Sequence, residues 1–342
     1  MKYNLLGKTG LLVSELCFGT MSFGGQGFWE VVGKQSQTEA NELIKTSFDA
    51  GINFFDTANV YSFGMSEQML GEAIRNLGLN RQELVVATKV RGRMAQGVNQ
   101  VGLSRYHIMN AAEDSLRRLG TDYIDLYYIH GVDKHTPMDE TLRALEDLVR
   151  SGKVRYLGVS NHAAWQIMKA LAISDKNGWS RFEASQSYYS IGGRYIEREI
   201  IPVLQDQQMA LIPWSPLAGG FLSGKYTREK DKVEGSRRDS FDFPPINKEK
   251  AFDIIDVMLE VGENHGVSAA RVALAWMLSK KAVTSIIIGA KRISQLKDNL
   301  AATELQLSVE DLERLDEVSA LSPEYPAWMI EMQNQGRLPE LK

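Results

Sequence analysis

The feature that most constrains this chain is a repeated alternation of short apolar runs with longer amphipathic stretches. Eight runs rich in β-branched and aromatic residues are typical of buried strands, and a plausible helix follows each one. Most of the runs begin about 30 to 40 residues apart, the size of one β/α unit. The predicted strands are Glu15 to Gly19, Ile52 to Asp56, Glu83 to Lys89, Tyr123 to His130, Val154 to Ser160, Phe182 to Ser187, Ala210 to Trp214 and Val283 to Gly289.

The stretches between these runs carry helical patterns. Apolar residues recur every three or four positions from Ser104 to Leu119 and again from Pro137 to Arg150. We expect the second helix to begin with Thr136 as its N-cap and Pro137 at the first helical position. Eight strand–helix units without a break in composition favour an α/β fold, a closed (β/α)8 TIM barrel, with residues 1–342 forming a single domain.

Two segments do not fit the repeat and are predicted to decorate the barrel. Lys2 to Leu6 and Leu11 to Ser14, joined across two glycines, predict an N-terminal hairpin that covers the barrel's lower mouth. Pro216 to Lys250, after the seventh strand, is rich in Gly, Ser, Pro and charge, which indicates a long functional loop.

Composition excludes several functions. The 39 basic against 43 acidic side chains leave a net charge of −4, so no electrostatic footprint for a nucleic acid or an anionic membrane is present. Cys17 is the single cysteine, which rules out an intramolecular disulfide. The sequence shows no apolar signal core near its start and no unbroken apolar run of about 18 residues. We therefore expect a cytoplasmic protein with no membrane or nucleic-acid partner.

Four polar residues fall at or just past the ends of predicted strands: Asp56, Tyr61, Lys89 and His130. In a parallel barrel these strand ends share the upper face, where chemistry is normally located. A buried ammonium at Lys89 would be costly unless a carboxylate such as Asp56 compensated it. The Asp56–Lys89 pair could have a purely structural role. Tyr61 or His130, taken alone, would be interpreted as an ordinary core residue.

Together the four predict a proton-donating site. A neighbouring ammonium favours the phenolate and should lower the pKa of Tyr61 from its ordinary value near 10. Tyr61 could then protonate a carbonyl oxygen that His130 also hydrogen-bonds, while Asp56 keeps Lys89 charged and oriented. This chemistry still requires a source of hydride.

From about Leu5 to Leu321 the chain resembles the aldo-keto reductase family. The segments that carry the resemblance are GINFFDTA at 51–58 with Tyr61, SE at 66–67, LG at 70–71, SLRRLGTDYIDL at 115–126, GKVR at 152–155 and GVSN at 158–161. The resemblance implies a (β/α)8 barrel that binds a nicotinamide dinucleotide, usually NADPH, and reduces aldehydes or ketones. It also implies a catalytic tetrad at Asp56, Tyr61, Lys89 and His130.

The resemblance further implies which residues hold the cofactor. Ser160, Asn161 and Gln186 match positions that bind the nicotinamide carboxamide, and Trp214 matches the aromatic on which the ring stacks. The remaining implied cofactor residues are Ser215, Leu217, Lys225, Gly289, Ala290, Gln295 and Asn299.

The region expected to hold a 2′-phosphate departs from the family's common pattern. Gln295 stands where many members have an arginine, as in branches that resemble the potassium-channel β subunits. Lys225, with Arg237 or Arg238, could supply the positive charge from the long loop, and Gly289 with Ala290 leads into a helix N-terminus. We expect NADPH to be preferred over NADH, and a solvated charged loop is the alternative.

Substrate contacts are predicted from aromatic residues in the loops, with Trp29 and Trp328 as the chosen pocket walls. Two other functions stay open. A reductase-like NADP-binding subunit could regulate a partner protein with little turnover, as the channel β subunits do. A metal-dependent barrel enzyme could use His130 and Asp56 as ligands, but the five histidines show no paired ligand spacing, so no metal site is expected.

Overall fold

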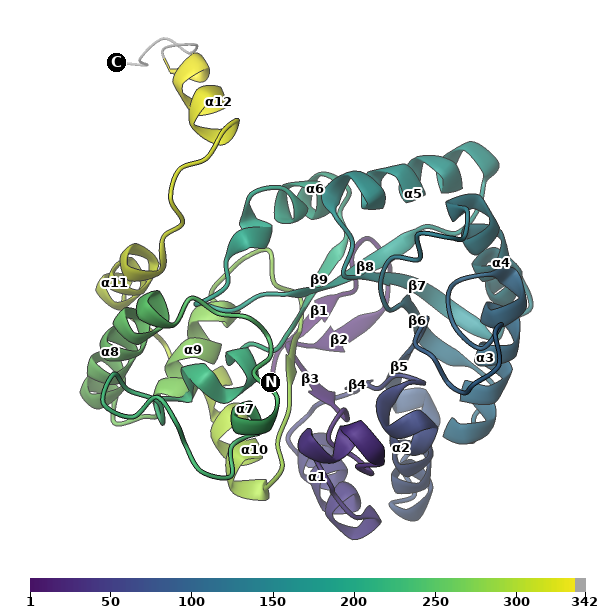
Figure 1. The fold of residues 1–342 in the computed structure, drawn as a ribbon, viewed down its shortest axis with the longest axis horizontal. Coiled ribbons are helices and arrows are strands. Elements are labelled where there is room, and N and C mark those ends of the chain that lie inside the picture. Colours follow the sequence, from purple (N-terminus) through teal and green to yellow (C-terminus); the bar gives the residue numbers. More distant parts are fainter. Residues whose placement is uncertain (336–342) are drawn as a thin grey trace.

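The computed structural model describes residues 1–335, and its centre is a ring of eight parallel strands (Figure 1). All eight predicted strands are confirmed, with ends that differ by three residues or fewer. The order around the ring is β10-β3-β4-β5-β6-β7-β8-β9, and a bridge from Leu211 to Val283 joins the β9 and β10 sides. The strands are β3 Leu16–Gly19, β4 Phe54–Asp56, β5 Val85–Val90, β6 Ile124–Ile129, β7 Val154–Ser160, β8 Phe182–Tyr188, β9 Ala210–Trp214 and β10 Ile286–Ile288.

Helices surround the ring, as the TIM-barrel prediction requires. They are α1 Gln37–Asp49, α2 Met65–Asn76, α3 Arg105–Leu119, α4 Met138–Arg150, α5 Ala164–Asn177, α6 Ile200–Asp206, α7 Arg237–Ser240, α8 Lys248–His265, α9 Ala269–Leu278, α10 Ile293–Leu300, α11 Val309–Ser319 and α12 Ala327–Asn334. Short 3-10 turns are η1 Gly27–Val31, η2 Tyr61–Gly64, η3 Arg81–Glu83, η4 Tyr195–Glu197, η5 Ala218–Ser223 and η6 Ala301–Thr303. None of the helices within residues 1–335 combines the length and apolar character needed to cross a bilayer.

Local signals explain where helices begin, with one correction. Ser104 caps α3 by accepting a hydrogen bond from the His107 amide. The start of α4 was predicted one residue too early, because Pro137 is the N-cap and the helix begins at Met138. The Thr136 hydroxyl donates to Asp133 at 2.7 Å, in the preceding turn, and so does not cap the helix.

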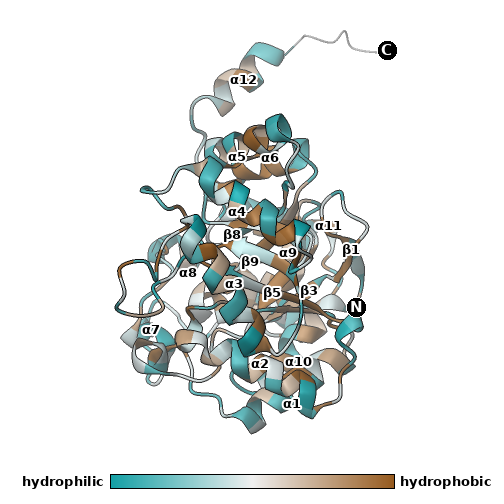
Figure 2. Cartoon of the chain, turned by 90° about the vertical axis from the view of Figure 1, so that its right-hand side faces the viewer, coloured by the Kyte–Doolittle hydropathy of each residue, from teal (hydrophilic) through white to brown (hydrophobic). Residues whose placement is uncertain are grey.

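The core has two apolar layers, and Figure 2 shows hydrophobic residues, in brown, on strands and on parts of the surrounding helices. The outer layer lies between strands and helices. The inner layer fills the barrel itself and includes Cys17, Phe54, Leu126 and Tyr128. Alternate side chains along each strand therefore point into the barrel or out toward the helices, which is how parallel strands buried on both faces pack.

The predicted hairpin is confirmed as β1 (Tyr3–Leu5) and β2 (Leu12–Ser14), and it covers the N-terminal end of the barrel. Leu6 and Val13 are fully buried in the inner layer. Gly7 has φ +59°, and a Cβ there would lie 2.6 Å from the Glu183 carbonyl, so the hairpin turn packs directly on the sheet. This end of the barrel is closed to solvent by apolar side chains.

Candidate active site

The structure brings the four predicted polar residues to the C-terminal end of the barrel. Asp56 ends β4, Lys89 lies near the end of β5, and His130 follows β6 directly. The ammonium of Lys89 lies 2.5 Å from Asp56 Oδ1 and 3.3 Å from the hydroxyl of Tyr61. It also donates to the Thr57 carbonyl at 2.8 Å. Its three protons therefore each have a polar partner, which compensates for its complete burial.

Tyr61 reaches this cluster because the loop after β4 is held in an unusual conformation. Ser62 and Phe63 have φ values of +48° and +53°. The Ser62 hydroxyl donates to the Phe23 carbonyl and accepts from the Gly25 amide, both at 2.9 Å. These bonds fix the turn that begins at Tyr61. The backbone of this turn therefore sets the position of the phenol.

The Asp56 carboxylate is held by two donors. Lys89 binds one oxygen, and the Gln186 amide donates to the other at 2.8 Å. Burial alone would lower the pKa of Lys89, but Asp56 and Tyr61 outweigh it and raise that pKa above its ordinary value. Burial raises the pKa of Asp56, while Lys89 and Gln186 act in the opposite direction. Lys89 therefore stays positively charged next to the hydroxyl of Tyr61.

The predicted acidification of Tyr61 is not what the structure shows. Burial raises the pKa of Tyr61 above its ordinary value, and Lys89 offsets only part of that increase. Desolvation wins because the phenol is 8% exposed and sits over the Lys89 ammonium, 4.8 Å from ring centre to Nζ. Tyr61 consequently keeps its proton throughout the neutral range, and Lys89 limits the cost of forming a phenolate rather than creating one at rest.

His130 faces Tyr61, with the two ring centres 5.7 Å apart. Burial lowers the pKa of His130 well below its ordinary value, and the charges of Lys89 and Arg91 lower it further. The imidazole of His130 is therefore neutral at neutral pH and can donate one hydrogen bond. The His130 carbonyl accepts from the Asn161 amide at 3.0 Å, and Asn161 in turn accepts from the Trp214 indole at 3.1 Å.

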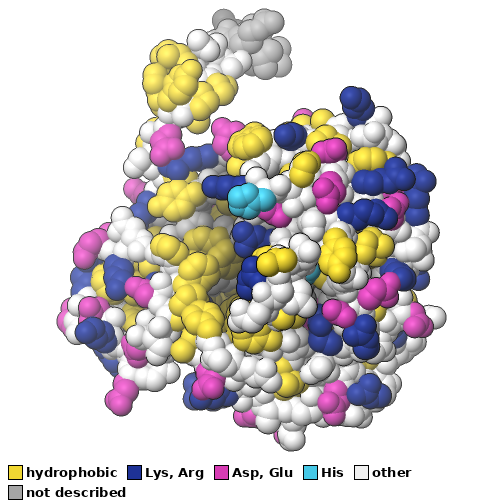
Figure 3. Space-filling view, turned by 45° about the vertical axis from the view of Figure 1, so that its right-hand side comes forward, with side chains coloured by type: hydrophobic (Ala, Val, Ile, Leu, Met, Phe, Trp, Pro, Cys, Tyr) yellow, Lys and Arg dark blue, Asp and Glu magenta, His cyan; other side chains and the backbone are white. Residues whose placement is uncertain are grey.

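A cavity of 990 Å³ opens beside this cluster and is visible as a hollow lined by hydrophobic side chains in Figure 3. Asp56, Tyr61 and His130 form part of its wall, whereas Lys89 lies behind them. Trp29 also lines it, with its ring 5.3 Å from that of Tyr61. All eleven residues predicted to hold the cofactor line the same cavity: Ser160, Asn161, Gln186, Trp214, Ser215, Leu217, Lys225, Gly289, Ala290, Gln295 and Asn299.

One end of the cavity is strongly cationic. Lys225, Arg237, Lys291 and Arg292 all line it. Burial lowers the pKa of Lys225; the charge of Asp239 acts in the opposite direction, and those of Arg237 and Arg292 lower it further. The Nε of Arg237 is buried and has no hydrogen-bond partner within residues 1–335. Crowded cations with an unpaired donor form an arrangement that suits a phosphate group.

Arg237 and Arg238, the two arginines considered for this end, make different contacts. Arg238 donates to the carbonyls of Ala218 and Pro244 and pairs with Asp242, so it fixes the loop after β9. Arg237 alone of the two reaches the cavity. Lys291 and Arg292 were missed as site residues by sequence reasoning, although their position directly after Gly289 and Ala290 was a usable signal.

Aromatic rings form the other walls, and some of them were also missed. Phe241 and Phe243 come from the long loop after β9 and line the cavity. Phe243 stacks on Trp214 with 5.7 Å between ring centres, and Phe241 contacts Phe28 from the loop after β3 at 5.1 Å. Two aromatics within a loop rich in Gly, Ser and charge were the available signal.

Trp328, the second predicted pocket wall, is not brought to the site. It lies on α12, which stands clear of the barrel in Figures 1 and 2, and its side chain is 45% exposed. The chain leaves α11 in a direction that carries this helix away from the cavity. Trp29 is therefore the one predicted substrate residue that lies at the cavity in this structure.

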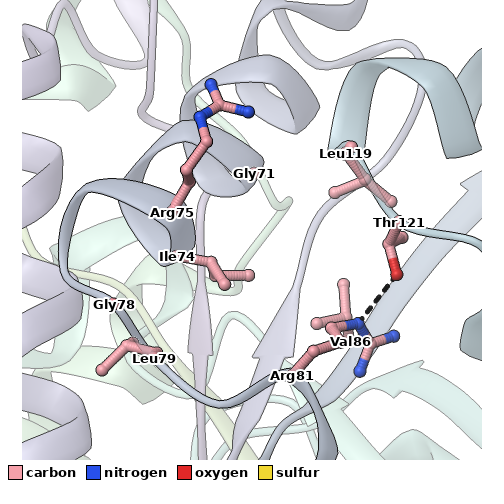
Figure 4. Close-up of a pocket in the computed structure, with 10 residues that line it drawn as sticks. Gly71, Ile74, Arg75, Gly78, Leu79, Arg81, Val86, Leu119 and Thr121 are labelled. Carbon is pink, nitrogen blue, oxygen red and sulfur yellow. Dashed lines mark hydrogen bonds between the residues drawn. The ribbon is translucent and has the colours of Figure 1, made fainter.

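A smaller pocket of 370 Å³ lies at the opposite end of the barrel, near the start of β5 (Figure 4). Its side chains leave little chemistry available. The Arg81 guanidinium donates to Thr121, Leu84 and Tyr123 and pairs with Asp125, which uses four of its five N–H donors. Within residues 1–335, no group of three His, Cys, Asp or Glu side chains is arranged to hold a metal ion.

Comparison with known proteins shows similarity to one family over nearly the whole chain. The sequence pattern of the Aldo/keto reductase family matches residues 15–320. A Schizosaccharomyces pombe protein provisionally named an aryl-alcohol dehydrogenase is 40% identical, covering 92% of this chain and 95% of its own length. Versiconal hemiacetal acetate reductase of Aspergillus parasiticus is 36% identical, covering 93% of this chain and 96% of its own length. An Arabidopsis thaliana protein provisionally named a voltage-gated potassium channel β subunit is 34% identical, covering 95% of this chain and 99% of its own length.

Proposed function

The chain belongs to the aldo/keto reductase family, and on that premise we propose that it reduces an aldehyde or ketone to an alcohol with NADPH, using Tyr61 as the general acid. The family and its oxidoreductase relatives support carbonyl reduction in general, and the family generally uses NAD(P)H. The observation that carries the specific proposal is the Tyr61 hydroxyl, 3.3 Å from the Lys89 ammonium in the wall of the 990 Å³ cavity.

Each polar side chain then has a defined task. The bound nicotinamide would supply the hydride. Tyr61 protonates the carbonyl oxygen, and the charge left on the phenolate is stabilised by the ammonium of Lys89. Neutral His130 donates a hydrogen bond to the same oxygen, which orients the carbonyl for proton transfer. Asp56 and Gln186 touch neither reacting atom and serve to keep Lys89 charged and in place.

The residues present fit a dinucleotide with a 2′-phosphate. The cavity is long enough to be lined both by Ser160 and Gln186 and by Gln295 and Asn299. At its cationic end, the buried Arg237 Nε has no hydrogen-bond partner among the residues that the structure describes, and a phosphate oxygen would satisfy it. NADH carries no phosphate at that position, so it would leave this donor unpaired. We therefore favour NADPH.

The substrate class is inferred from the walls beside Tyr61. Trp29 lies beside Tyr61, Phe28 contacts Trp29, and both rings line the cavity; we infer that such aromatic walls favour flat apolar substrates over hydrated sugars. The name of the Schizosaccharomyces pombe relative points to the same class for that protein. We infer that aromatic aldehydes are reduced with higher kcat/KM than aliphatic aldehydes of similar size.

The test is an assay of NADPH oxidation by the purified chain against aromatic aldehydes, aliphatic aldehydes and ketones, repeated with NADH. We expect turnover of at least one aromatic aldehyde and a higher kcat/KM with NADPH. Absence of carbonyl reduction with either cofactor would overturn the proposed activity. Preference for NADH would overturn only the assignment of the cationic end.

A second candidate is a regulatory subunit that binds NADP with little turnover, supported by the similarity to the Arabidopsis protein. The same assay separates the two. Tight NADPH binding without turnover, together with a stoichiometric protein partner on purification, would favour the regulatory function.

A further inference from the structure

The chain ends in a segment that leaves the barrel with apolar side chains uncovered. We call residues 320–334, which include α12, the C-terminal arm. Its large apolar side chains are open to solvent: Tyr325 is 74% exposed, Trp328 45%, Ile330 55% and Met332 53%. Figure 3 shows the arm as a cluster of hydrophobic side chains held away from the body. Such a cluster marks a contact surface on a soluble protein.

The arm cannot be explained as a free-standing helix. α12 spans eight residues, and isolated helices shorter than about 12 residues are marginal in water. No residue of α12 is buried against the barrel. The stability of such a short apolar helix must therefore come from packing on another surface, and the arm's own body does not supply one in this conformation.

The body also carries exposed apolar side chains, on α5 and in the turn before α6. We call Trp165, Met168 and Tyr195 the body patch; their side chains are 66%, 36% and 58% exposed. Trp165 and Met168 lie on the first turns of α5, and Tyr195 lies in η4, just before α6. α5 and α6 pack against each other, so both parts of the patch lie at the same end of neighbouring elements.

One arginine ties the base of the arm to this patch. Arg198 forms an ion pair with Glu324 of the arm at 2.8 Å. Its guanidinium also lies over the Tyr195 ring, 5.4 Å from the ring centre. The base of the arm and the Tyr195 part of the body patch are therefore neighbours. A two-fold axis beside Arg198 would place each arm on the other copy's patch, because a symmetric dimer uses the same surface twice.

The charges on the two surfaces are complementary. Glu331 is the one ionised side chain of α12, and it forms no ion pair within residues 1–335. Lys169 lies one helical turn after Trp165 on α5, is exposed, and likewise has no ion-pair partner in that part of the chain. When Trp328 packs near Trp165, Glu331 and Lys169 fall one turn away on each helix.

We propose that the C-terminal arm docks on the body patch of a second copy of this chain, forming a symmetric homodimer with exchanged arms. The contact would cover the exposed apolar side chains of α12 and pair Glu331 with Lys169. This inference concerns a surface separate from the cavity and does not depend on which reaction the cavity performs.

The first experiment measures the mass of the full-length protein in solution by sedimentation equilibrium. We expect twice the 38.3 kDa mass of one chain. Trp328→Glu in the arm and Trp165→Glu in the patch should each raise the dimer dissociation constant more than about tenfold, the effect of losing a buried aromatic anchor. Tyr106→Glu is the matched control, because Tyr106 is a 67% exposed aromatic on α3 and lies outside both surfaces. Circular dichroism checks that each variant is folded.

Two further measurements distinguish exchange from other contacts. Mixing Trp328→Glu with Trp165→Glu leaves one intact arm and one intact patch, so a heterodimer should form between two otherwise monomeric variants. Glu331→Lys and Lys169→Glu should each weaken the dimer, and the double variant should restore it. A monomeric wild type at all concentrations would overturn the proposal. So would a dimer that survives Trp165→Glu, since the arm would then dock elsewhere.

Discussion

The two ends of the barrel bury side chains equally well but with opposite chemistry. At the N-terminal end, Leu6 and Val13 of the hairpin are 0% exposed and cover the inner layer with apolar side chains. At the C-terminal end, Lys89 is 0% exposed and Asp56 2%, yet both are ionisable. Burial of apolar area favours folding at the first end, whereas at the second the desolvation of two charges opposes it.

This difference shows that the fold tolerates the burial of charged groups at its C-terminal end. Gln186 and the Thr57 carbonyl complete the hydrogen bonds of Asp56 and Lys89, which limits the desolvation cost. The same bonds hold an ammonium beside a phenol, an arrangement with no purpose in packing alone. Apolar burial at the closed end stabilises the barrel. That stability offsets the cost of burying charged groups at the open end. The following predictions test this division.

The largest effect should come from removing one hydroxyl at the open end. Tyr61→Phe should lower kcat for carbonyl reduction about 10²- to 10⁴-fold, the usual contribution of a general acid, while NADPH affinity stays within about twofold. Steady-state kinetics and a fluorescence titration of NADPH measure the two quantities.

Tyr127→Phe is the matched control on the neighbouring strand β6. Tyr127 is fully buried in the outer layer, and its hydroxyl has no hydrogen-bond partner within the described residues. Its removal should leave kcat nearly unchanged. If both phenylalanine variants lost activity equally, the assignment of Tyr61 as the acid would fail.

The next effect concerns the closed end and stability alone. Leu6→Ala should lower the free energy of unfolding by about 2–5 kcal/mol through lost apolar contact and a residual cavity. It should leave kcat/KM of the folded enzyme unchanged. Urea unfolding measures the first quantity. Leu5→Ala is the control, because that side chain is 54% exposed and its loss should cost about 0.5 kcal/mol or less. A large loss of kcat/KM in Leu6→Ala would show that the two ends are coupled.

A smaller effect is expected on cofactor choice at the cationic end of the cavity. Lys225→Ala should weaken NADPH binding about 10- to 100-fold, the value of a charge-assisted hydrogen bond, and leave NADH binding nearly unchanged. Lys232→Ala in the same long loop is the control, because Lys232 is exposed and does not line the cavity. If Lys225→Ala weakened the binding of NADPH and NADH equally, another residue would have to contact the phosphate.

The smallest effect is a pH dependence that comes from His130. Its pKa in the fold is well below the ordinary 6.5, so the unfolded chain gains a proton as the pH falls below about 6.5 while the folded chain does not. Stability should therefore decline from pH 6.5 downward, by about 1.4 kcal/mol for each unit over which only the unfolded state is protonated. The decline should be smaller in His130→Asn, as measured by urea unfolding at several pH values. Identical slopes in the two proteins would show that His130 is protonated in the fold.

Much of the fold was predictable because strand and helix periodicities are local properties of the sequence. The eight strands and the hairpin came directly from apolar runs and their spacing. The N-cap of α4 was misplaced because the Thr136 hydroxyl has a competing acceptor in Asp133, which the sequence pattern did not reveal. Strand ends were also informative about the site, since a parallel barrel places them all on one face.

The remaining features depended on long-range contacts. The raised pKa of Tyr61 follows from a balance between burial and charge that spacing alone does not set. Phe241 and Phe243 reach the cavity only because the loop after β9 folds back across it. Trp328 was predicted as a pocket wall from its position after the barrel, but the direction of the arm carries it away.

The contact between Phe28 and Phe241 has a consequence for the timing of the reaction. These rings come from loops on either side of β10 and meet at 5.1 Å while both line the cavity. We expect a dinucleotide bound in this cavity to lie beneath them, so that it enters or leaves only after the rings part. We therefore expect exchange of the spent cofactor, rather than hydride transfer, to set the pace of repeated catalysis, so that a rapid first cycle precedes a slower steady state.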